Sequence, residues 1–462
     1  MTQPLDVSGK RVLVVGLGKS GVASALFLHE RGGRVTVSDN RSEDQLADAI
    51  PTLLDKGIAV ETGAHRERTF REQDLIVVSP GVPTDVPQLA YSRELGIPVV
   101  GEIELAARFL RGKIVAITGS NGKTTTTALT GSVISWGGWE VQVGGNIGTP
   151  AISLVATSTE DTYNVVEVSS FQLETIQTFR PYIAVVLNVT PDHLDRHGTL
   201  DSYIAAKARV FENQSSSDYA VLNAEDTTCV HLAKMTKAQV RWFSGRREVG
   251  PGAFVRESKI FWRDESGERE IMPVSDMQLK GAHNVGNVLA AVCVGMITEC
   301  EPGRIRRAVS EFKAVEHRLE YVAVVNGVQY FNDSKATNVD ATIKALESFP
   351  ANIHLILGGK DKGSDYTVLA PLLRERVKCV YTIGAAAEKI ESQIADAAQI
   401  VRASTLEAAV RRASEAAVAG DVVLLAPACA SFDQFKSYEE RGQVFKSVVK
   451  ALEARQQQVG AK

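Results

Sequence analysis

The sequence predicts an α/β protein built on mainly parallel sheets, and three observations support this prediction. The chain has 462 residues, which is too long for one core and corresponds to about three domains of roughly 150 residues. Short runs rich in Val, Ile and Leu alternate with helical patterns, as in parallel sheets covered by helices. Glycine-rich loops at Gly16 and Gly119 each follow a strand pattern and open a helix pattern. We therefore expect a chain of several α/β domains.

The strand patterns divide the chain into three blocks. The boundaries fall near Gly101 and Glu316, which gives domains over residues 1–101, 102–315 and 316–462. The first and last domains are expected to be Rossmann-like, and the central one to resemble P-loop ATPases. The predicted strands are Arg11–Gly16, Arg34–Ser38 and Asp74–Ser79; Lys113–Thr118, Tyr163–Val168 and Ile183–Val189; and Tyr321–Val325, Val328–Asn332, Ile353–Gly358, Val377–Gly384 and Asp421–Pro427.

Two stretches depart from the parallel pattern. Polar alternation and turn residues between Gln239 and Val274 predict a small antiparallel insertion in the central domain. In the last domain, Asn326-Gly327 separates two strand patterns, which is a strong signal for a two-residue β-hairpin. We expect the remaining sheets to be parallel.

The composition excludes several classes of protein. A net charge of −4 with 23% charged residues is ordinary for a globular protein, and it does not point to a nucleic-acid partner. The apolar run Val288–Ile297 is too short to cross a membrane, and the first residues do not resemble a targeting segment. Five scattered cysteines are expected to be reduced and mostly buried. These features predict a cytoplasmic protein without membrane insertion.

The first glycine-rich loop predicts a ligand that carries phosphate and a sugar. Gly16-Leu-Gly-Lys-Ser-Gly21 follows a strand, and Asp39 ends the next strand. This arrangement is typical of a dinucleotide site, where the helix N-terminus binds phosphate and the carboxylate binds a sugar hydroxyl. NAD and a UDP-sugar both fit it. A Rossmann-like domain without a ligand is the third interpretation.

The second loop, Gly119-Ser-Asn-Gly-Lys-Thr, predicts a polyphosphate site. Gly119 and Gly122 let backbone N–H groups turn inward, Lys123 can reach the outer phosphates, and the hydroxyl of Thr124 can bind magnesium. Glu167 ends a buried strand, where a carboxylate is costly unless it meets a cation. A carboxylate facing solvent is the alternative. His193 follows another strand and is a candidate for a second metal.

The segment Thr-Gly-x-Asn-Gly-Lys-Thr-Thr resembles that of the Mur ligase and folylpolyglutamate synthetase family, although Ile117 replaces the first glycine of the general P-loop pattern. The resemblance implies ATP with Mg²⁺, or Mn²⁺ as an alternative, and a carbamylated Lys207. The nucleotide residues it implies are Gly119, Asn121, Gly122, Lys123, Thr124, Thr125, Asn284, Arg318, Asp333 and Lys335. The implied metal ligands are Thr124, Glu167, His193 and Lys207, and the implied catalytic residues are Lys123, His193, Lys207 and Arg318. A UDP-muramoyl substrate would contact Lys19, Ser20, Asp39, Ser79 and Asn146.

The last domain indicates the amino acid. Asp333-Ser-Lys-Ala-Thr-Asn338 resembles the segment of family members that add D-glutamate to UDP-N-acetylmuramoyl-L-alanine through an acyl phosphate. On that resemblance Thr337, Lys362, Ser431 and Tyr438 would bind D-glutamate, while Asp333 and Lys335 would contact the nucleotide or act in domain closure. Lys360 is the alternative to Lys362, and Tyr438 stands where the family favours phenylalanine. Both substrates are small molecules, and we expect a monomer.

Three other functions stay open at this point. A paralogous ligase would add a different amino acid with the same chemistry. An NAD-dependent oxidoreductase would explain Gly16 and Asp39 but leaves Lys123 and Glu167 without a role. A nucleotide-binding regulator would need the phosphate loop but no amino-acid site.

Overall fold

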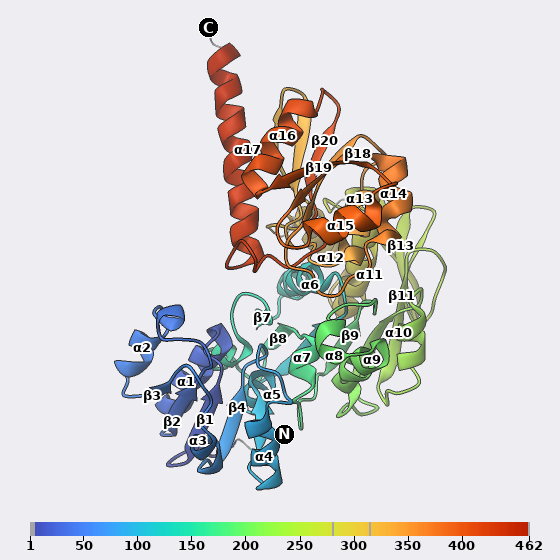
Figure 1. Ribbon diagram of the computed structural model, residues 1–462. Coiled ribbons are helices and arrows are strands. Elements are labelled where there is room, and N and C mark those ends of the chain that lie inside the picture. The colour runs from blue at the N-terminus through green and yellow to red at the C-terminus, as the bar shows by residue number, and fades with distance from the viewer. Residues whose placement is uncertain (1–4, 280, 314–315, 461–462) are drawn as a thin grey trace. The chain divides into compact units, whose positions relative to one another are not determined.

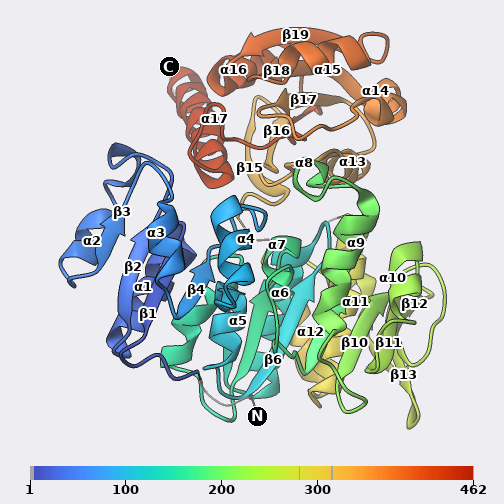
Figure 2. The same cartoon turned by 60° about the horizontal axis from the view of Figure 1, so that its bottom comes forward.

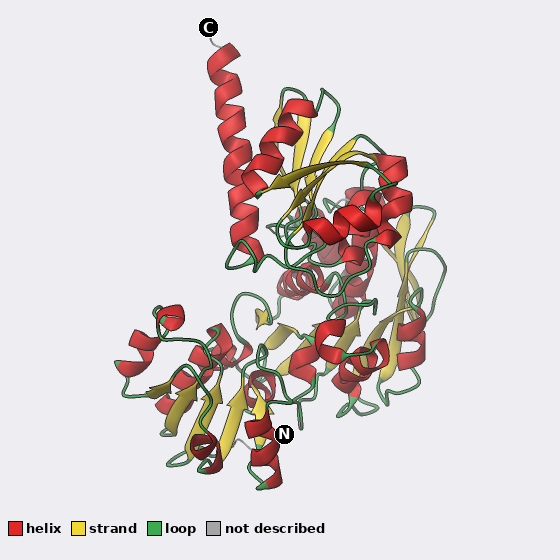
Figure 3. Ribbon diagram, in the orientation of Figure 1, coloured by secondary structure: helices red, strands yellow, loops and turns green. Residues whose placement is uncertain are grey.

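The computed structural model describes residues 5–279, 281–313 and 316–460 and contains three sheets flanked by helices (Figure 1, Figure 3). This confirms the predicted α/β fold. The chain forms two compact units: Met1–Val189, Gly198–Asp276 and Gly286–Ser310 make up the first, and Thr190–His197, Met277–Val285 and Glu311–Lys462 the second. The first unit holds two of the sheets. The predicted boundary near Gly101 therefore stays a prediction. The predicted boundary near Glu316 also stays a prediction, and residues 314–315 beside it lie outside the described residues.

The first sheet has five parallel strands in the order β3-β2-β1-β4-β5. Val, Ile and Leu fill these strands because helices cover both faces. The strands are β1 (Arg11–Val15), β2 (Arg34–Ser38), β3 (Ala59–Glu61), β4 (Leu75–Val78) and β5 (Val99–Gly101). The helices are α1 (Lys19–Glu30), α2 (Ile50–Leu54), α3 (Glu67–Arg71), α4 (Pro87–Glu94) and α5 (Glu102–Ala107). The carboxyl ends of β2, β1 and β4 lie side by side.

The second sheet has nine strands in the order β14-β13-β12-β11-β10-β9-β6-β8-β7. They are β6 (Lys113–Thr118), β7 (Val141–Gly145), β8 (Tyr163–Glu167), β9 (Ile183–Val186), β10 (Tyr219–Asn223), β11 (Gln239–Ser244), β12 (Gly252–Arg256), β13 (Lys259–Asp264) and β14 (Gly267–Pro273). The helices along this stretch are α6 (Lys123–Gly137), α7 (Ser170–Leu173), α8 (Leu194–His197), α9 (Leu200–Ala208), α10 (Thr227–Leu232), α11 (Ala282–Ile297) and α12 (Pro302–Glu311). Strand β6 lies between β9 and β8, so their loops meet at one edge.

The third sheet has six strands in the order β15-β16-β20-β17-β18-β19. Figure 2 shows this sheet with β15, β16, β17, β18 and β19 labelled. They are β15 (Glu320–Val325), β16 (Val328–Asn332), β17 (Ile353–Gly358), β18 (Val377–Ile383), β19 (Gln399–Ser404) and β20 (Val422–Leu425). The helices are α13 (Val339–Glu347), α14 (Ala370–Arg376), α15 (Ala387–Ile394), α16 (Leu406–Ala416) and α17 (Tyr438–Gly460). Strands β16, β20 and β17 are parallel neighbours, so the loops that follow them gather at one edge.

Two sequence predictions about strand direction have different outcomes. The hairpin at Asn326-Gly327 is confirmed: β15 and β16 are antiparallel, and both turn residues have positive φ, 52° and 76°. The antiparallel insertion is wrong in part. Strand β11 pairs in parallel with both neighbours, and the antiparallel pairs of this region are β12 with β13 and β13 with β14. These strands also extend the main sheet instead of forming a separate one.

Among the described residues, no helix combines the length and the apolar character that crossing a membrane requires. All five cysteines are buried and free of disulfides, as expected from their scattered positions.

Candidate active site

The phosphate loop joins the fully buried end of β6 to α6. Gly119 has φ +146° and Gly122 has φ +85°, which favour glycine. A Cβ on Gly122 would lie 2.3 Å from Oδ1 of Asn287, so this position also lacks room for a side chain. Asn188, two residues after β9, accepts from the N–H of Asn121 at 2.8 Å and donates to its carbonyl at 3.1 Å. The segment after the neighbouring strand therefore fixes the backbone of the phosphate loop at Asn121.

Two lysines donate to carbonyls of this loop. Nζ of Lys123 lies 3.0 Å from the carbonyl of Gly119 and 2.8 Å from that of Ser120. Nζ of Lys207, from α9, lies 2.9 Å from the same Gly119 carbonyl and 4.4 Å from the centroid of the Tyr203 ring. Lys207 is buried, with 1% of its surface exposed. The fold thus brings Lys207, which is distant in sequence, to the phosphate loop.

A buried carboxylate lies beside the first turn of α6. Oε2 of Glu167 accepts a 2.7 Å hydrogen bond from the hydroxyl of Thr124, and Oε1 accepts a 3.1 Å hydrogen bond from the amide of Asn146. Glu167 is 2% exposed. Within the described part of the chain, no Lys, Arg or His forms an ion pair with it. Because a buried carboxylate is costly without a cation, this arrangement fits a site for a hard metal ion.

The five-stranded sheet carries a second candidate site where β1, β2 and β4 end. The hydroxyl of Ser79 donates to the carbonyl of Gly16 at 2.8 Å, which ties the loop after β4 to the loop after β1. A Cβ on Gly21 would lie 1.8 Å from the Gly16 carbonyl, so α1 can pack this closely only with glycine there. Lys19 and Ser20 form the first turn of α1. Backbone N–H groups at this helix start can bind a phosphate.

Asp39 is held by a residue that the sequence analysis missed. Its carboxylate accepts hydrogen bonds from the N–H of Leu17 at 2.7 Å and from the N–H, Nε and Nη2 of Arg41 at 2.9, 3.0 and 2.8 Å. Burial raises the pKa of Asp39, but the hydrogen bonds from Arg41 and Leu17 outweigh it and hold the pKa below its ordinary value. Asp39 and Arg41 therefore act as one charged pair at the sheet edge.

In the second unit, Asp333 follows β16 and is buried. Burial raises its pKa to about 6, although Arg318 and the N–H of Leu319 oppose the shift. Among the residues that the structure describes, its Oδ1 has no hydrogen-bond partner, and neither has Nε of Arg318. Nearby His283 has its pKa lowered to about 4, first by burial and then by Arg318. The buried Asn284 follows it, and its N–H donates to the carbonyl of Gly281. Asp333 and Arg318 thus keep polar atoms available for a ligand.

The loop after β16 is tied to the start of α17. Nζ of Lys335 donates to the hydroxyl of Tyr438 at 3.1 Å, and the hydroxyl of Ser334 donates to the Tyr438 carbonyl at 2.8 Å. Arg441 is 1% exposed and donates to the Ser334 carbonyl at 2.7 Å and to the Cys429 carbonyl at 3.2 Å. The Tyr438 hydroxyl thus orients Lys335. Nothing in the sequence singled out Arg441.

Asp192 connects the His193 segment to the amino-acid loops. It accepts from the amide of Asn338 at 2.9 Å and pairs with Nζ of Lys362 at 3.6 Å, and Nε2 of His193 lies 3.6 Å from it. All four residues belong to the second unit, so His193 is placed here with the last domain. Thr337 lies one residue before Asn338, which caps α13 through the N–H of Ala341.

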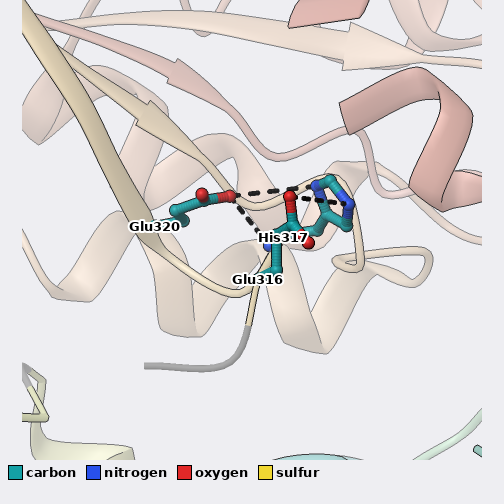
Figure 4. Close-up of side chains that lie close together, drawn as sticks. All are labelled: Glu316, His317 and Glu320. Atoms are coloured by element: carbon teal, nitrogen blue, oxygen red, sulfur yellow. Dashed lines mark hydrogen bonds and ion pairs between the residues drawn. The ribbon is translucent and has the colours of Figure 1, made fainter. Parts of the chain in front are cut away.

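The group Glu316, His317 and Glu320 brings three possible metal ligands within 4.8 Å of one another (Figure 4). Lys446 already pairs with both carboxylates, at 2.6 Å from Glu316 and 2.7 Å from Glu320. His317 has φ 64° and donates its N–H to Glu320 at 2.9 Å. These contacts describe an ion-pair cluster that fixes the backbone just before Arg318, rather than a metal site.

The predicted site residues therefore fall into two sets. The first unit brings together Thr124, Asn146 and Glu167, and it also places Lys123 and Lys207 at the phosphate loop. The second unit holds His193, Asn284, Arg318, Asp333, Lys335, Thr337, Lys362, Ser431 and Tyr438.

Comparisons with known proteins agree with this arrangement. Three family models match consecutive parts of the chain: the Mur ligase MurD-like N-terminal domain over residues 10–101, the Mur ligase middle domain over 117–295 and the Mur ligase glutamate ligase domain over 317–429. The UDP-N-acetylmuramoylalanine–D-glutamate ligase of Koribacter versatilis is 66% identical over 448 residues, which cover 97% of this chain and 99% of that protein. The protein of the same name from Acidobacterium capsulatum is 57% identical over 449 residues, 97% of each chain.

Solved structures show the same fold at lower identity. The UDP-N-acetylmuramate–alanine ligase of Thermotoga maritima has a TM-score of 0.60 and 20% identity, covering 96% of this chain and 99% of that one. The MurF ligase of Thermotoga maritima, solved in complex with ADP, has a TM-score of 0.61 and 16% identity, with 98% of both chains covered. The models and the full-length relatives together show that the chain belongs to the Mur ligase family.

Proposed function

We propose that this protein is an ATP-dependent ligase that joins D-glutamate to UDP-N-acetylmuramoyl-L-alanine in peptidoglycan precursor synthesis. The observation that carries the proposal is the 66% identity, along 97% of the chain, to a relative named for this reaction. The arrangement of polar groups supports it, because each of the three sheets gathers them at the carboxyl ends of adjacent parallel strands, where ligands of such sheets bind.

The five-stranded sheet would bind the UDP-substrate. The first turn of α1, with Lys19 and Ser20, suits the pyrophosphate, and the Asp39–Arg41 pair offers hydrogen bonds to the uridine end. Ser79 fixes the loop between them. Asn146, beside Glu167, would contact the muramoyl end of the substrate. That end carries the reactive carboxylate, which must reach the phosphate loop to be phosphorylated.

The phosphate loop would bind ATP. The backbone N–H groups of residues 119–125 and the ammonium of Lys123 suit its phosphates, and Asn284 and Arg318 are further residues proposed to contact the nucleotide. Thr124 and Glu167 fit Mg²⁺ because both offer oxygen ligands and because Glu167 is buried without a cationic partner among the described residues. His193 and a carbamylated Lys207 complete the proposed ligand set. Bound magnesium would reduce the repulsion between phosphate oxygens and the attacking carboxylate.

The reaction then proceeds in two balanced steps. A carboxylate oxygen of the alanyl group attacks the γ-phosphorus, and ADP leaves, which gives an acyl phosphate. The amine nitrogen of D-glutamate attacks the acyl carbon, phosphate leaves with that oxygen, and the amine loses a proton. Lys123 and Arg318 stabilise the charge that moves between oxygens, so positioning and electrostatics supply most of the catalysis.

D-Glutamate would bind at the third sheet, between the loops after β16, β20 and β17. Thr337, Ser431 and Tyr438 supply hydroxyl groups there, and Lys362 supplies a cation. Lys362 suits the role better than Lys360, whose side chain is exposed and whose backbone pairs with Ala430. The side chain of Lys362 is 15% exposed, and its ammonium pairs with the carboxylate of Asp192. It can therefore bind a substrate carboxylate in the same way.

An isotope experiment tests the acyl-phosphate step. UDP-N-acetylmuramoyl-L-alanine labelled with ¹⁸O in the alanine carboxylate is incubated with ATP and D-glutamate, and the released phosphate is analysed by mass spectrometry. One labelled oxygen in the phosphate is the expected result, since the oxygen that attacks phosphorus leaves with it. Unlabelled phosphate accompanied by amide formation would rule out this mechanism.

The proposal also includes a monomer that works in the cytoplasm. Five buried cysteines without disulfides suit a reducing compartment. Light scattering after gel filtration at enzyme concentrations used for assays tests the state of association. A mass near 50 kDa is expected from the chain mass of 49.8 kDa, and a multiple of it would contradict the monomer.

A further inference from the structure

The loop that carries Lys360 and Lys362 is held by the acidic residue between them. Oδ1 of Asp361 accepts from the hydroxyl of Tyr366 at 2.8 Å and from the N–H of Ser364 at 3.1 Å. Oδ2 pairs with Nζ of Lys389, from α15, at 2.7 Å. Burial raises the pKa of Asp361, but the hydrogen bonds from Lys389 and Tyr366 outweigh it and lower the pKa. The carboxylate is thus fixed from two sides.

Tyr366 extends this contact to the next loop. Its side chain is completely buried, and its hydroxyl lies 3.0 Å from Sγ of Cys429, two residues before Ser431. The backbone joins the same two loops, because Lys360 and Ala430 exchange hydrogen bonds of 2.8 and 3.1 Å. Two loops that we assign to D-glutamate are therefore connected through both backbone and side chains.

Arg441 connects these loops to the third one. Its guanidinium donates to the Cys429 carbonyl and to both the carbonyl and the hydroxyl of Ser334. Ser334 lies in the segment that ends at Thr337 and Asn338. A continuous series of contacts therefore runs from Lys389 through Asp361, Tyr366, Cys429 and Arg441 to Ser334. It joins the loops after β17, β20 and β16.

We propose that Asp361 is a positioning residue for D-glutamate, which directs Lys362 into the amino-acid site. The inference rests on the proposed function and goes beyond it by assigning a role to a residue that would not touch the substrate. Lys360 and Lys362 lie two residues apart on one short loop and could exchange places if the loop turned. Asp361 lies between them, and its carboxylate is anchored by Tyr366, Ser364 and Lys389. The loop therefore presents Lys362 and leaves Lys360 exposed.

The consequence is a selective change in the binding of D-glutamate. Asp361→Ala removes both anchors and should raise KM for D-glutamate by about 10-fold to 100-fold, since misplacing a binding group by about 1 Å has effects of that size. KM for ATP and for the UDP-substrate should stay within about 2-fold, because their proposed sites do not depend on this loop. Asp361→Asn keeps the acceptor for Tyr366 but loses the pair with Lys389, so its effect should be smaller.

Asp365→Ala is the matched control. Asp365 lies four residues along in the same loop region, carries the same charge and accepts hydrogen bonds from the N–H and hydroxyl of Thr367. Among the described residues it forms no hydrogen bond with the side chains of Tyr366 or Cys429. The KM of the Asp365→Ala variant for D-glutamate should stay at the wild-type value. An equal rise in both variants would show that charge or loop stability, rather than the anchor at Asp361, is responsible.

A double-mutant cycle makes the test specific. If Asp361 acts through Lys362, adding Asp361→Ala to a Lys362→Ala variant should change KM for D-glutamate by less than about 2-fold. An undiminished effect in that background would overturn the proposal, as would an unchanged KM in Asp361→Ala itself. Thermal melting of each variant separates loss of folding from loss of positioning. Failure of the wild-type protein to use D-glutamate at all would instead contradict the proposed function.

Discussion

Replacing Glu167 by Gln tests the buried carboxylate with almost no change in shape. The amide oxygen can accept from Asn146, and the amide nitrogen can donate to the hydroxyl of Thr124, which also accepts hydrogen bonds. Both hydrogen bonds can therefore persist. We expect the free energy of unfolding to change by less than about 1.5 kcal/mol, the net value of one such bond. What Glu167→Gln removes is the negative charge.

The effect on turnover should be much larger than the effect on stability. Losing one group that stabilises charge in a transition state typically costs about 10²-fold to 10³-fold in kcat, or about 2.7–4 kcal/mol. A charged metal ligand belongs to this class. We also expect half-saturation by Mg²⁺ to move to higher concentration, because the variant binds the ion with one charge fewer.

Phosphate release at saturating substrates, measured over a range of Mg²⁺ concentrations, provides the assay. Glu174→Gln is the control, since it makes the same chemical change at the end of α7 and should leave turnover within about 3-fold of wild type. Turnover of Glu167→Gln near the wild-type value, with unchanged Mg²⁺ dependence, would refute the assignment. A variant that melts far below wild type would show that the carboxylate acts in folding.

Three further predictions concern single side chains. Lys123→Ala should lower turnover by about 10²-fold or more without changing thermal melting, and near-normal phosphate release would contradict its role. Lys207→Ala should regain activity when a short carboxylate such as acetate is added, while mass spectrometry that finds only unmodified Lys207 in the active enzyme would count against carbamylation. Asp39→Asn should lower the free energy of unfolding by about 1.5–3 kcal/mol at neutral pH, since hydrogen bonds to a charged group are lost. Because the pKa of Asp39 is lowered in the folded state, the difference in free energy of unfolding between the wild type and Asp39→Asn should be complete above the unfolded pKa of about 3.9. It should shrink as the pH falls through the folded pKa. Urea unfolding at several pH values measures this difference, and a difference independent of pH would contradict the pairing with Arg41.

The strands predicted most accurately are those buried on both faces. Lys113–Thr118 and Ile353–Gly358 match β6 and β17, because a continuous apolar run is the direct signature of a central parallel strand. Strands β3, β5, β7, β10 and β19 were missed. All but β10 lie at sheet edges, and β3 and β5 have three residues each, too few to show a period. Strand β10 lies between β9 and β11 in the second sheet and was missed although it is central.

The sequence also predicted which strand ends carry polar groups, but it could not show how those groups pair. Glu167 was a candidate because it ends a buried strand, and Thr124 because its hydroxyl follows Gly122-Lys123 in the phosphate loop. Arg441 lies over 100 residues from its partner Ser334, within an amphipathic helix where an arginine is unremarkable. Hydrogen bonds between residues this far apart in sequence depend on the order of strands in the sheet, which the sequence patterns do not give. Arg41 could have been found, since it lies two residues after Asp39.

The most direct test of the account is phosphate release from ATP in the presence of UDP-N-acetylmuramoyl-L-alanine, with D-glutamate, L-glutamate, L-alanine or meso-diaminopimelate as the second substrate. We expect release with D-glutamate and none above background with the other three. Release that depends on a different amino acid would keep the ligase chemistry but contradict the assignment of the third sheet. Absence of release with all four would contradict the proposed function.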